Sequence, residues 1–243
     1  MRILVIGDIH AETSWKKFAD IEQLLQSNVF ETKYDKYIFL GDYFDSFKVP
    51  TDKMKRNFYD IVRFKKNYPD KVILLLGNHE LHYFMVPYVA TNNYLCSGYR
   101  SEVHVDAYEF YKENANLFQA AYQIDNYIFT HAGISEGWFR DIFKIPQGHP
   151  ETKTIAELLN EAFETRDSRL FAVGFSRGGL YQYGGPFWAD KSETAMFPLF
   201  GYHQIVGHSK VDRISRIEKN ETTSITFCDV LQSKNPEPYI LEI

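Results

Sequence analysis

The chain has 243 residues, of which 44% are hydrophobic and 24% charged, and its net charge is −5. This length fits one α/β domain with a substantial core, and the composition is that of a soluble globular protein. The negative charge argues against a dedicated nucleic-acid-binding protein, because phosphate backbones require a basic face, and no apolar run approaches the ~20 residues of a membrane span. The two cysteines, Cys96 and Cys228, favour free thiols and therefore a cytoplasmic protein.

The first third of the chain alternates strand patterns with helix patterns. Residues 3–6, 37–40 and 72–76 are continuous apolar runs, which are typical of buried parallel strands. Between them, residues 15–28 and a segment that starts at Pro50 carry apolar residues at helical spacing. This order predicts parallel pairing with right-handed crossovers.

The remainder of the chain is predicted to hold two further helices, a glycine-rich loop and a β-rich end. The helices are expected over about 107–122 and over 155–163, and the loop over 174–185. We expect one domain over residues 1–243, with a parallel first half and a more antiparallel second half. The strands of that second half are predicted at 127–129, 205–206, 214–217, 224–230 and 239–243.

Five of the apolar runs end in residue types that bind metal ions. The carboxyl ends of strands collect functional groups in open α/β sheets, so these ends predict one shared site. Carboxylate, imidazole and amide oxygen suit Mn, Fe, Zn or Co better than Cu(I) or an iron–sulfur cluster. The five segments are Gly7-Asp8-Ile9-His10, Gly41-Asp42-Tyr43-Phe44-Asp45, Gly77-Asn78-His79-Glu80, Thr130-His131-Ala132-Gly133 and Gly207-His208-Ser209-Lys210.

In order and residue type these segments resemble the motifs of the calcineurin-like metallophosphoesterase superfamily. The pattern there is D-x-H, G-D-x-x-D, G-N-H-[DE], a lone His and then G-H-x-[H or another residue]. The resemblance runs from Gly7 to Lys210, which is most of the chain. It implies an α/β fold in which two mixed β-sheets pack face to face with helices outside, a four-layer arrangement.

The resemblance also implies two divalent metal ions, with Mn as the first choice and Fe, Zn or Co as alternatives. Asp8 and His10 would hold the first ion, and their spacing fits because positions two apart in an extended segment face the same way. Asp42 would bridge both ions. For any one of these residues alone, an Asp or Asn after a strand is as readily a helix N-cap. The ligands of the second ion would be Asn78, His131 and His208.

Three further residues receive roles from the resemblance. His79 would act as the general acid at the leaving-group oxygen, and Asp45 would accept its other N–H and fix its tautomer. Asp45 could instead be a turn residue. Arg177, in the glycine-rich loop before Trp188-Ala189-Asp190, could clamp phosphoryl oxygens, because a guanidinium suits an oxygen pair. Its alternative is an exposed loop arginine.

Two departures from the family pattern bear on the substrate. Ser46-Phe47 stands where the serine/threonine protein phosphatases and the symmetrical dinucleoside tetraphosphate hydrolases have Arg-Gly. Lys210 stands where many phosphodiesterases and nucleases have a second His, which the protein phosphatase branch also lacks. The metal-binding motifs are therefore closer to the serine/threonine protein phosphatase-like branch, while its phosphate-clamp arginine is absent from the usual place.

We therefore predict a phosphomonoesterase that acts on a small molecule or a phosphoprotein with a hydroxide held by the two metal ions. A phosphodiesterase or nucleotide pyrophosphohydrolase is the first alternative, and a non-catalytic scaffold of the same fold is the second. The aromatic segment 83–99 is either core or part of a substrate groove. Four histidines match no motif and are predicted to lie outside the site: His82, His104, His149 and His203.

Overall fold

The structure is a computed structural model that describes residues 1–21, 32–85, 96–144 and 153–243. Two compact units make up the chain. The N-terminal unit comprises Met1–Phe118 together with Val230–Ile243, and the second unit comprises Gln119–Asp229. The single domain over residues 1–243 stays a prediction.

The sheet of the N-terminal unit has the strand order β10-β1-β2-β3-β4. As predicted, β1, β2 and β3 pair in parallel, and β10 adds an antiparallel edge next to β1. Parallel pairing brings the carboxyl ends of the first three strands to one edge of the sheet. The strands span Arg2–Ile6 (β1), Lys36–Phe39 (β2), Val72–Leu75 (β3), Phe118–Gln119 (β4) and Tyr239–Glu242 (β10).

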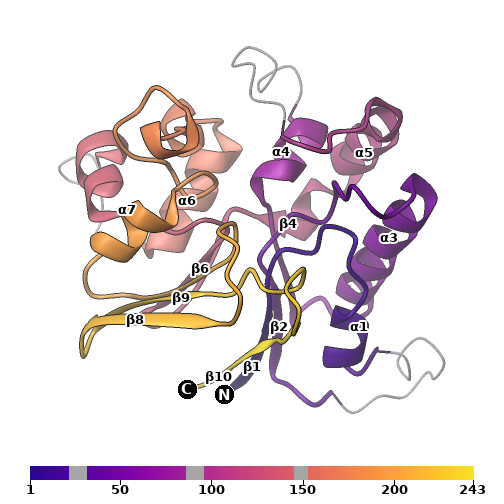
Figure 1. Cartoon of the computed structure of the whole chain (residues 1–243), viewed down its shortest axis with the longest axis horizontal. Helices are drawn as coiled ribbons and strands as arrows, with labels where there is room; N and C mark the ends of the chain where they lie inside the picture. The colour runs from indigo at the N-terminus through magenta and orange to yellow at the C-terminus, as the bar shows by residue number, and fades with distance from the viewer. Residues whose placement is uncertain (22–31, 86–95, 145–152) are drawn as a thin grey trace. The chain divides into compact units, whose positions relative to one another are not determined.

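Helices α1 and α3 lie on one side of this sheet (Figure 1). Helix α3 begins directly after Pro50, as predicted, and buries Met54, Phe58 and Ile61 against the unit. The helix predicted over 15–28 begins at Trp15, but residues 22–31 of that prediction lie outside the described residues. The helical segments are Trp15–Phe18 (α1), Thr51–Asn67 (α3), Asn78–Phe84 (α4), Ser101–Asn114 (α5) and the 3₁₀ turn Ala115–Leu117.

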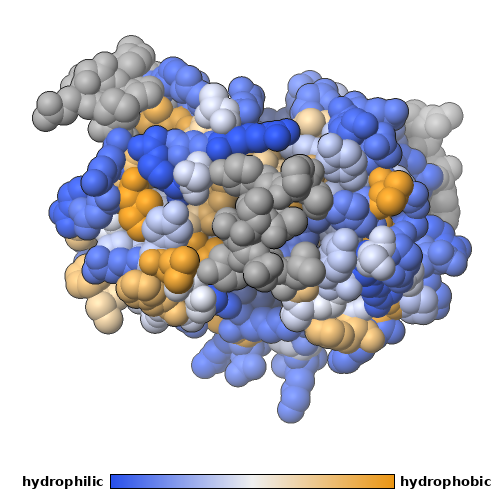
Figure 2. Space-filling model, turned by 90° about the horizontal axis from the view of Figure 1, so that it is seen from above, coloured by the Kyte–Doolittle hydropathy of each residue, from blue (hydrophilic) through white to orange (hydrophobic). Residues whose placement is uncertain are grey.

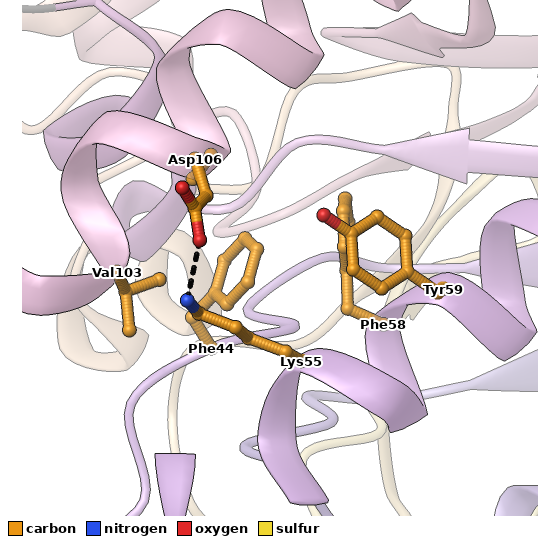
Figure 3. Close-up of a pocket in the computed structure, with 7 residues that line it drawn as sticks. Phe44, Lys55, Phe58, Tyr59, Val103 and Asp106 are labelled. Atoms are coloured by element: carbon orange, nitrogen blue, oxygen red, sulfur yellow. Dashed lines mark hydrogen bonds and ion pairs between the residues drawn. The ribbon is translucent and has the colours of Figure 1, made fainter. Parts of the chain in front are cut away.

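A pocket between α3 and α5 shows how the core supports the loop after β2 (Figure 3). Residues of both helices line it, and an ion pair of 2.6 Å between Lys55 Nζ and Asp106 Oδ2 joins the helices. Phe44 also lines the pocket, and its ring centroid lies 4.6 Å from that of Phe58 and 5.1 Å from that of Tyr83. Burial of such a ring contributes about 2–3 kcal/mol, so Phe44 anchors the loop that carries Asp42 and Asp45.

The sheet of the second unit has the strand order β5-β6-β7-β9-β8. It is mixed: β6, β7 and β9 run parallel, while β5 and β8 are antiparallel to their neighbours. Helices α6 and α7 lie on one side of it (Figure 1). The strands are Ala121–Ile124 (β5), Tyr127–Thr130 (β6), His203–Val206 (β7), Ser215–Asn220 (β8) and Thr223–Phe227 (β9). The helical segments are Ile155–Glu164 (α6), Lys191–Met196 (α7), the π-helix Trp138–Phe143 and the 3₁₀ turns Ser168–Phe171 and Phe175–Arg177.

The helix predicted over about 107–122 is wrong at both ends. Helix α5 spans Ser101–Asn114, and the last predicted residues belong to β5 instead. Asp125 and Asn126 join β5 to β6, and Asp125 has a φ of +49°. A two-residue connection of this kind is a hairpin signal, and pairing with β6 outweighs the weak helical preference of the segment.

Two mixed five-stranded sheets with flanking helices confirm the predicted α/β fold class. The face of the molecule in Figure 2 is largely hydrophilic, and its hydrophobic residues form small separate groups. Among the described residues, the helices are all too short or too polar to span a membrane.

Candidate metal centre

The predicted metal ligands of the N-terminal unit follow the carboxyl ends of its three parallel strands. Asp8 and His10 come after β1, Asp42 after β2 and Asn78 after β3. All four side chains are buried, with exposed fractions from 1% for Asp8 to 7% for His10. Burial of carboxylates is costly unless donors or a cation compensate them, so this edge of the sheet has the composition of a cation site.

The loops after β1 and β2 hold several site residues in the left-handed region of backbone conformation. The φ angles are +39° for His10, +52° for Asp42 and +65° for Asp45. Such backbone costs roughly 1–3 kcal/mol at a residue other than glycine, and it clusters where side-chain placement matters for function. Gly77 supplies the space between the loops, because a Cβ atom there would lie 2.1 Å from Asp42 Oδ1.

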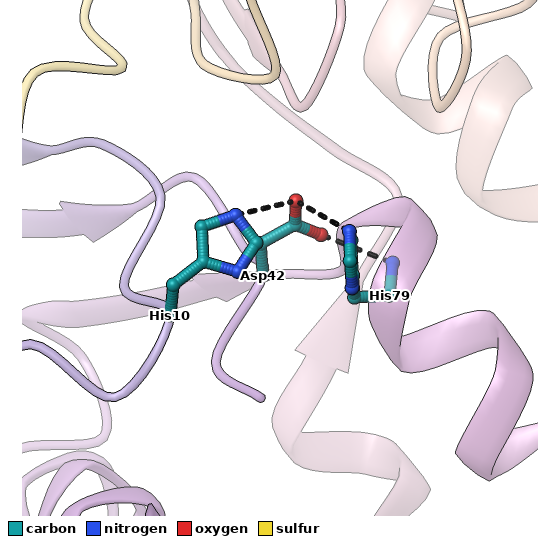
Figure 4. A group of neighbouring side chains, drawn as sticks. All are labelled: His10, Asp42 and His79. Atoms are coloured by element: carbon teal, nitrogen blue, oxygen red, sulfur yellow. Dashed lines mark hydrogen bonds and ion pairs between the residues drawn. The ribbon is translucent and has the colours of Figure 1, made fainter. Parts of the chain in front are cut away.

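His10 is oriented as a metal ligand. Its Nδ1 lies 3.0 Å from the carbonyl oxygen of Phe44, which can only accept a hydrogen bond. Nδ1 therefore carries a proton, and Nε2 points to the Asp42 carboxylate, 3.6 Å from Oδ2 (Figure 4). Histidines that bind metal ions commonly donate their second N–H to a carbonyl or carboxylate in this way.

His79 has a matching arrangement on the other side of Asp42. Its Nδ1 lies 2.7 Å from Asp45 Oδ2, its Nε2 lies 3.9 Å from Asp42 Oδ2, and its backbone N–H donates to Asp42 Oδ1 over 3.0 Å (Figure 4). Burial lowers the pKa of His79, but the Asp42 charge and the Asp45 hydrogen bond raise it more, so the net shift of its pKa is upward. The predicted pair of His79 with Asp45 is therefore present.

His10, Asp42 and His79 form a group whose ligand atoms lie within 4.8 Å of one another. Asp8 is buried at the same end of β1 but is not a member of this group. The group places His79 Nε2 where it could either bind an ion or give a proton to a substrate held beside Asp42. The donor set of two imidazoles and a carboxylate suits Mn, Fe, Zn or Co.

Sequence reasoning assigned no role to Glu80, which is fully buried. Its carboxylate accepts the backbone N–H groups of Gly77, Asp42 and Tyr43 over 2.7–2.8 Å, and so joins the loop after β2 to the loop after β3. Burial and the Asp42 charge raise the pKa of Glu80 to about 8. The acidic residue after Asn78-His79 was the available signal, since a Glu at this helix position commonly caps the first turn.

Tyr83 was also missed as a site residue. Its hydroxyl donates to Asp45 Oδ1, and the backbone N–H of Arg100 donates to the same hydroxyl over 2.9 Å. Burial and the nearby Asp45 charge raise the pKa of Tyr83, which keeps the hydroxyl protonated. Within the aromatic segment 83–99, Tyr83 and Phe84 thus belong to the core, while Tyr88 and Tyr94 lie outside the described residues.

In the second unit, His131 and His208 follow the adjacent parallel strands β6 and β7. Nε2 of His131 lies 3.1 Å from Nδ1 of His208, and the Gly207 N–H donates to the His131 carbonyl over 2.8 Å. Two nitrogen ligands about 2.1 Å from one ion and at about 90° to each other are separated by roughly 3 Å. The observed separation therefore fits two ligands of one ion.

Arg177 is fixed within the second unit. Its Nε lies 2.9 Å from Asp190 Oδ2, and its Nη2 donates to Ser209 Oγ over 2.8 Å. Ser209 directly follows His208, so the guanidinium is held beside the loop of a predicted ligand. This contradicts the alternative of a freely exposed loop arginine. Lys210, the next residue, is exposed.

The histidines predicted to lie outside the site differ among themselves. His203 bonds Ser224 Oγ over 2.8 Å at the start of β7, whereas His208 follows the end of that strand. His149 lies outside the described residues. His82 is buried and contacts Cys96, which in turn contacts Asn78.

Comparisons with known proteins agree with this geometry. The family model described as calcineurin-like phosphoesterase matches residues 1–212. The catalytic subunit of serine/threonine-protein phosphatase 6 from Drosophila melanogaster is 33% identical over 84 residues, which are 32% of this chain and 22% of the fly protein. The chain thus matches about a fifth of the length of that relative.

A solved structure shows the same fold. The cold-active protein-tyrosine phosphatase of a psychrophile, Shewanella sp., is similar with a TM-score of 0.60 and 15% identity, over 99% of this chain and 75% of that chain. Together with the family match, the buried histidine and aspartate groups confirm the prediction of a metallophosphoesterase. Because the family model covers most of the sequence, the chain belongs to the calcineurin-like phosphoesterase family.

Proposed function

We propose that the chain is a phosphomonoesterase that acts on a small phosphorylated molecule or on a phosphoprotein. The observation that carries this proposal is the His79–Asp45 pair next to Asp42. The pair presents one ring nitrogen of His79 toward the converging ligand atoms and fixes the other at 2.7 Å from Asp45. This is the geometry that a general acid beside a bound phosphoryl group requires.

In this proposal Asp8, His10 and Asp42 would hold one divalent ion, Asn78, His131 and His208 would hold a second, and Asp42 would be a ligand of both. The fixed tautomer of His10 and the 3.1 Å separation of His131 and His208 support these assignments within each unit. Manganese is our first choice, and Fe, Zn or Co would fit the same donors. When bound, two such ions lower the pKa of a water molecule toward ~7 and neutralise charge on the phosphoryl group.

The chain's own residues would do three things. His79 would give its Nε2 proton to the leaving oxygen, and Asp45 would stabilise the imidazolium before transfer and keep the ring oriented. Arg177 would bind phosphoryl oxygens, held ready by Asp190 and Ser209. The backbone N–H of His79 would keep the Asp42 carboxylate in one orientation.

A monoester substrate is supported by one feature of the sequence and by one comparison. Lys210 stands where many diesterases of the family have a histidine, and the matched part of the fly relative belongs to a protein named as a serine/threonine phosphatase. The usual phosphate-binding arginine of that branch is absent, because Ser46-Phe47 stands in its place. In this proposal Arg177 therefore binds the phosphoryl oxygens instead.

The test is His79→Asn, assayed with p-nitrophenyl phosphate and with an alkyl phosphate after reconstitution with Mn²⁺. We expect kcat on the alkyl ester to fall by ~10²–10⁴, the usual contribution of general acid–base catalysis. The loss should be smaller for p-nitrophenyl phosphate, whose leaving group needs little protonation, and the metal content should stay at two ions. His203→Asn is the matched control.

Two results would contradict these roles. An equal loss on both esters would exclude proton donation by His79, and a loss of one bound ion would make His79 a ligand. A panel that adds bis-p-nitrophenyl phosphate, a phosphopeptide and a dinucleoside polyphosphate would then separate monoesterase from diesterase and pyrophosphohydrolase activity.

A further inference from the structure

Behind the first turn of α4, a buried cysteine contacts the predicted ligand Asn78, and a buried histidine contacts that cysteine. The exposed fractions are 8% for Cys96, 1% for His82 and 3% for Asn78. Neither Cys96 nor His82 belongs to a family motif in the sequence. Cys96 nevertheless contacts the Asn78 amide directly, and His82 contacts Cys96.

The hydrogen bonds of His82 define its tautomer. The backbone N–H of Cys96 can only donate, and it lies 2.8 Å from His82 Nδ1, so Nδ1 is the acceptor. Burial lowers the pKa of His82 to about 4, and the ring is neutral. The proton therefore sits on Nε2, which lies 3.3 Å from Cys96 Sγ and donates to it.

The sulfur of Cys96 in turn contacts the Asn78 amide. Asn78 Nδ2 lies 3.0 Å from Cys96 Sγ, and the Asn78 backbone carbonyl lies 3.7 Å from the same sulfur. Because Nδ2 faces the sulfur, the amide oxygen is on the opposite side of the planar group. An amide can bind a hard divalent ion only through that oxygen.

We propose that Cys96 and His82 are a positioning pair that holds the Asn78 amide with its oxygen directed toward a divalent ion. The inference rests on the proposed function, because it takes Asn78 as a ligand. A side-chain amide has two nearly isosteric orientations, and only one of them offers oxygen to the ion. The thiol selects that orientation by accepting from the amide nitrogen, and His82 holds the thiol in place.

The experiment compares metal binding by Cys96→Ala, Cys96→Ser and the wild type, titrated with Mn²⁺ by calorimetry after chelator treatment. Residues that orient metal ligands typically contribute 10–100-fold to metal affinity. We expect Cys96→Ala to weaken one of the two sites by at least ~10-fold and to leave the other within ~3-fold. Cys96→Ser, which retains a small acceptor, should stay within ~3-fold of the wild type at both sites.

Two further variants separate orientation from packing. Cys228→Ala removes the other buried cysteine, in the second unit, and should bind both ions like the wild type. Asn78→Asp offers an oxygen on both sides of the side chain, so adding Cys96→Ala to it should cause no further loss of affinity. A double-mutant cycle of this kind isolates the coupling between the two side chains.

The outcomes are distinct. Wild-type affinity of Cys96→Ala at both sites would overturn the inference. So would equal losses when Cys96→Ala is introduced into the wild type and into the Asn78→Asp variant, because the cysteine would then act through general packing. Failure of the wild type itself to bind two ions would overturn the proposed function, and with it this inference, and that defect is visible without any variant.

Discussion

The N-terminal unit and the second unit hold the histidines of the predicted site in different ways. In the N-terminal unit, a protein acceptor fixes one ring nitrogen of each histidine: the Phe44 carbonyl for His10 and the Asp45 carboxylate for His79. The other nitrogen of each ring faces Asp42. In the second unit, the nitrogens of His131 and His208 that suit a common ion form a hydrogen bond with each other.

This difference has a consequence for metal binding. Nε2 of His10 can bind an ion without a change of tautomer, because Nδ1 already carries a proton. His131 and His208 cannot both bind an ion while one donates a proton to the other, so that proton must move or leave. Metal binding by His131 and His208 therefore requires a proton shift that metal binding by His10 does not.

The largest effect is expected for Asp42→Asn. This substitution tests the group of His10, Asp42 and His79 in the N-terminal unit. The amide would keep an oxygen for the His79 backbone N–H, but its NH₂ group would face the ring nitrogens of His10 and His79. We expect kcat on p-nitrophenyl phosphate to fall by at least ~10³ and metal content to fall below two ions. Asp106→Asn, which removes an exposed ion pair with Lys55 in the same unit, is the matched control.

Metal analysis and activity must change together in this experiment. Full metal content with full activity in Asp42→Asn would mean that the converging group is not the metal site. A fall in activity with two tightly bound ions would place the role of Asp42 in the reaction and not in metal binding.

The next effect is a loss of folding stability in acid, which is caused by the buried side chain of His82. The pKa of His82 is lowered to about 4 when folded, against about 6.5 in an unfolded chain. Between these values only the unfolded chain takes up the proton, so stability is lost as the pH falls from about 6.5 toward 4. The loss between pH 7 and pH 5 should be about 2 kcal/mol.

Denaturant unfolding of metal-free wild type and His82→Gln at pH 7 and pH 5 measures this contribution. The variant lacks the titrating ring, so its stability should fall by about 2 kcal/mol less than that of the wild type over this range. The comparison within one protein cancels the lower starting stability of the variant. Equal pH dependence in the two proteins would show that His82 does not titrate differently on folding.

A smaller effect is expected for Tyr83→Phe. This substitution tests whether the hydrogen bond from the Tyr83 hydroxyl to Asp45 keeps the Asp45–His79 pair in position. The phenylalanine keeps the ring packing but removes the donor to Asp45 and the acceptor of the Arg100 N–H. Loss of one hydrogen bond of about 1.4 kcal/mol corresponds to a tenfold fall in kcat on alkyl phosphates. The fall should be within threefold for p-nitrophenyl phosphate, and KM should not change.

Tyr99→Phe is the control for this substitution, because its ring stacks on Tyr83 with centroids 5.2 Å apart. Removal of a hydroxyl from the same aromatic cluster should leave both substrates unaffected. An equal fall on both esters in Tyr83→Phe would indicate a loss of structure at the site in place of a loss of proton transfer.

The sequence predicted the structure well where one short segment contains both a strand and a metal-ligand residue. Continuous apolar runs that end in Asp8, Asp42 and Asn78 predicted the parallel strands and their shared edge, because strand and ligand are adjacent in the chain. The partners of Tyr83 and Cys96 lie 38 and 14 to 18 residues away and obey no periodicity. Only the fold brings such residues together, so no pattern of spacing predicts them.

The errors in the element predictions have a similar origin. The segment after Asn114 was predicted as helix because its residues have helical preference, but pairing of β5 with β6 decides its structure. The loop that holds Arg177 is not such an error, but the contacts of Arg177 with Asp190 and Ser209 could be found only in the structure. Long-range pairing thus determined what local preference could not.

The smallest effect is expected for substitutions of Lys210, in the second unit. The residue is exposed and follows Ser209, which is buried and bonds Arg177. A cation close to two divalent ions would be repelled, so exposure of Lys210 agrees with a side chain that does not take part in metal binding. Its position is still the one where many family members have a histidine ligand.

Lys210→Ala should therefore leave metal content unchanged and alter the free energy of unfolding by no more than about 0.5 kcal/mol, as for most exposed substitutions. Lys210→His should bind the first ion more tightly, because a neutral imidazole replaces a cation, and should shift preference toward diesters. Chelator titration of the three proteins, with activity on p-nitrophenyl and bis-p-nitrophenyl phosphate, measures both effects. If Lys210→Ala loses an ion, the lysine supports the metal centre. If Lys210→His changes neither affinity nor preference, position 210 does not correspond to the family's histidine, and its lysine is then no argument for a monoester substrate.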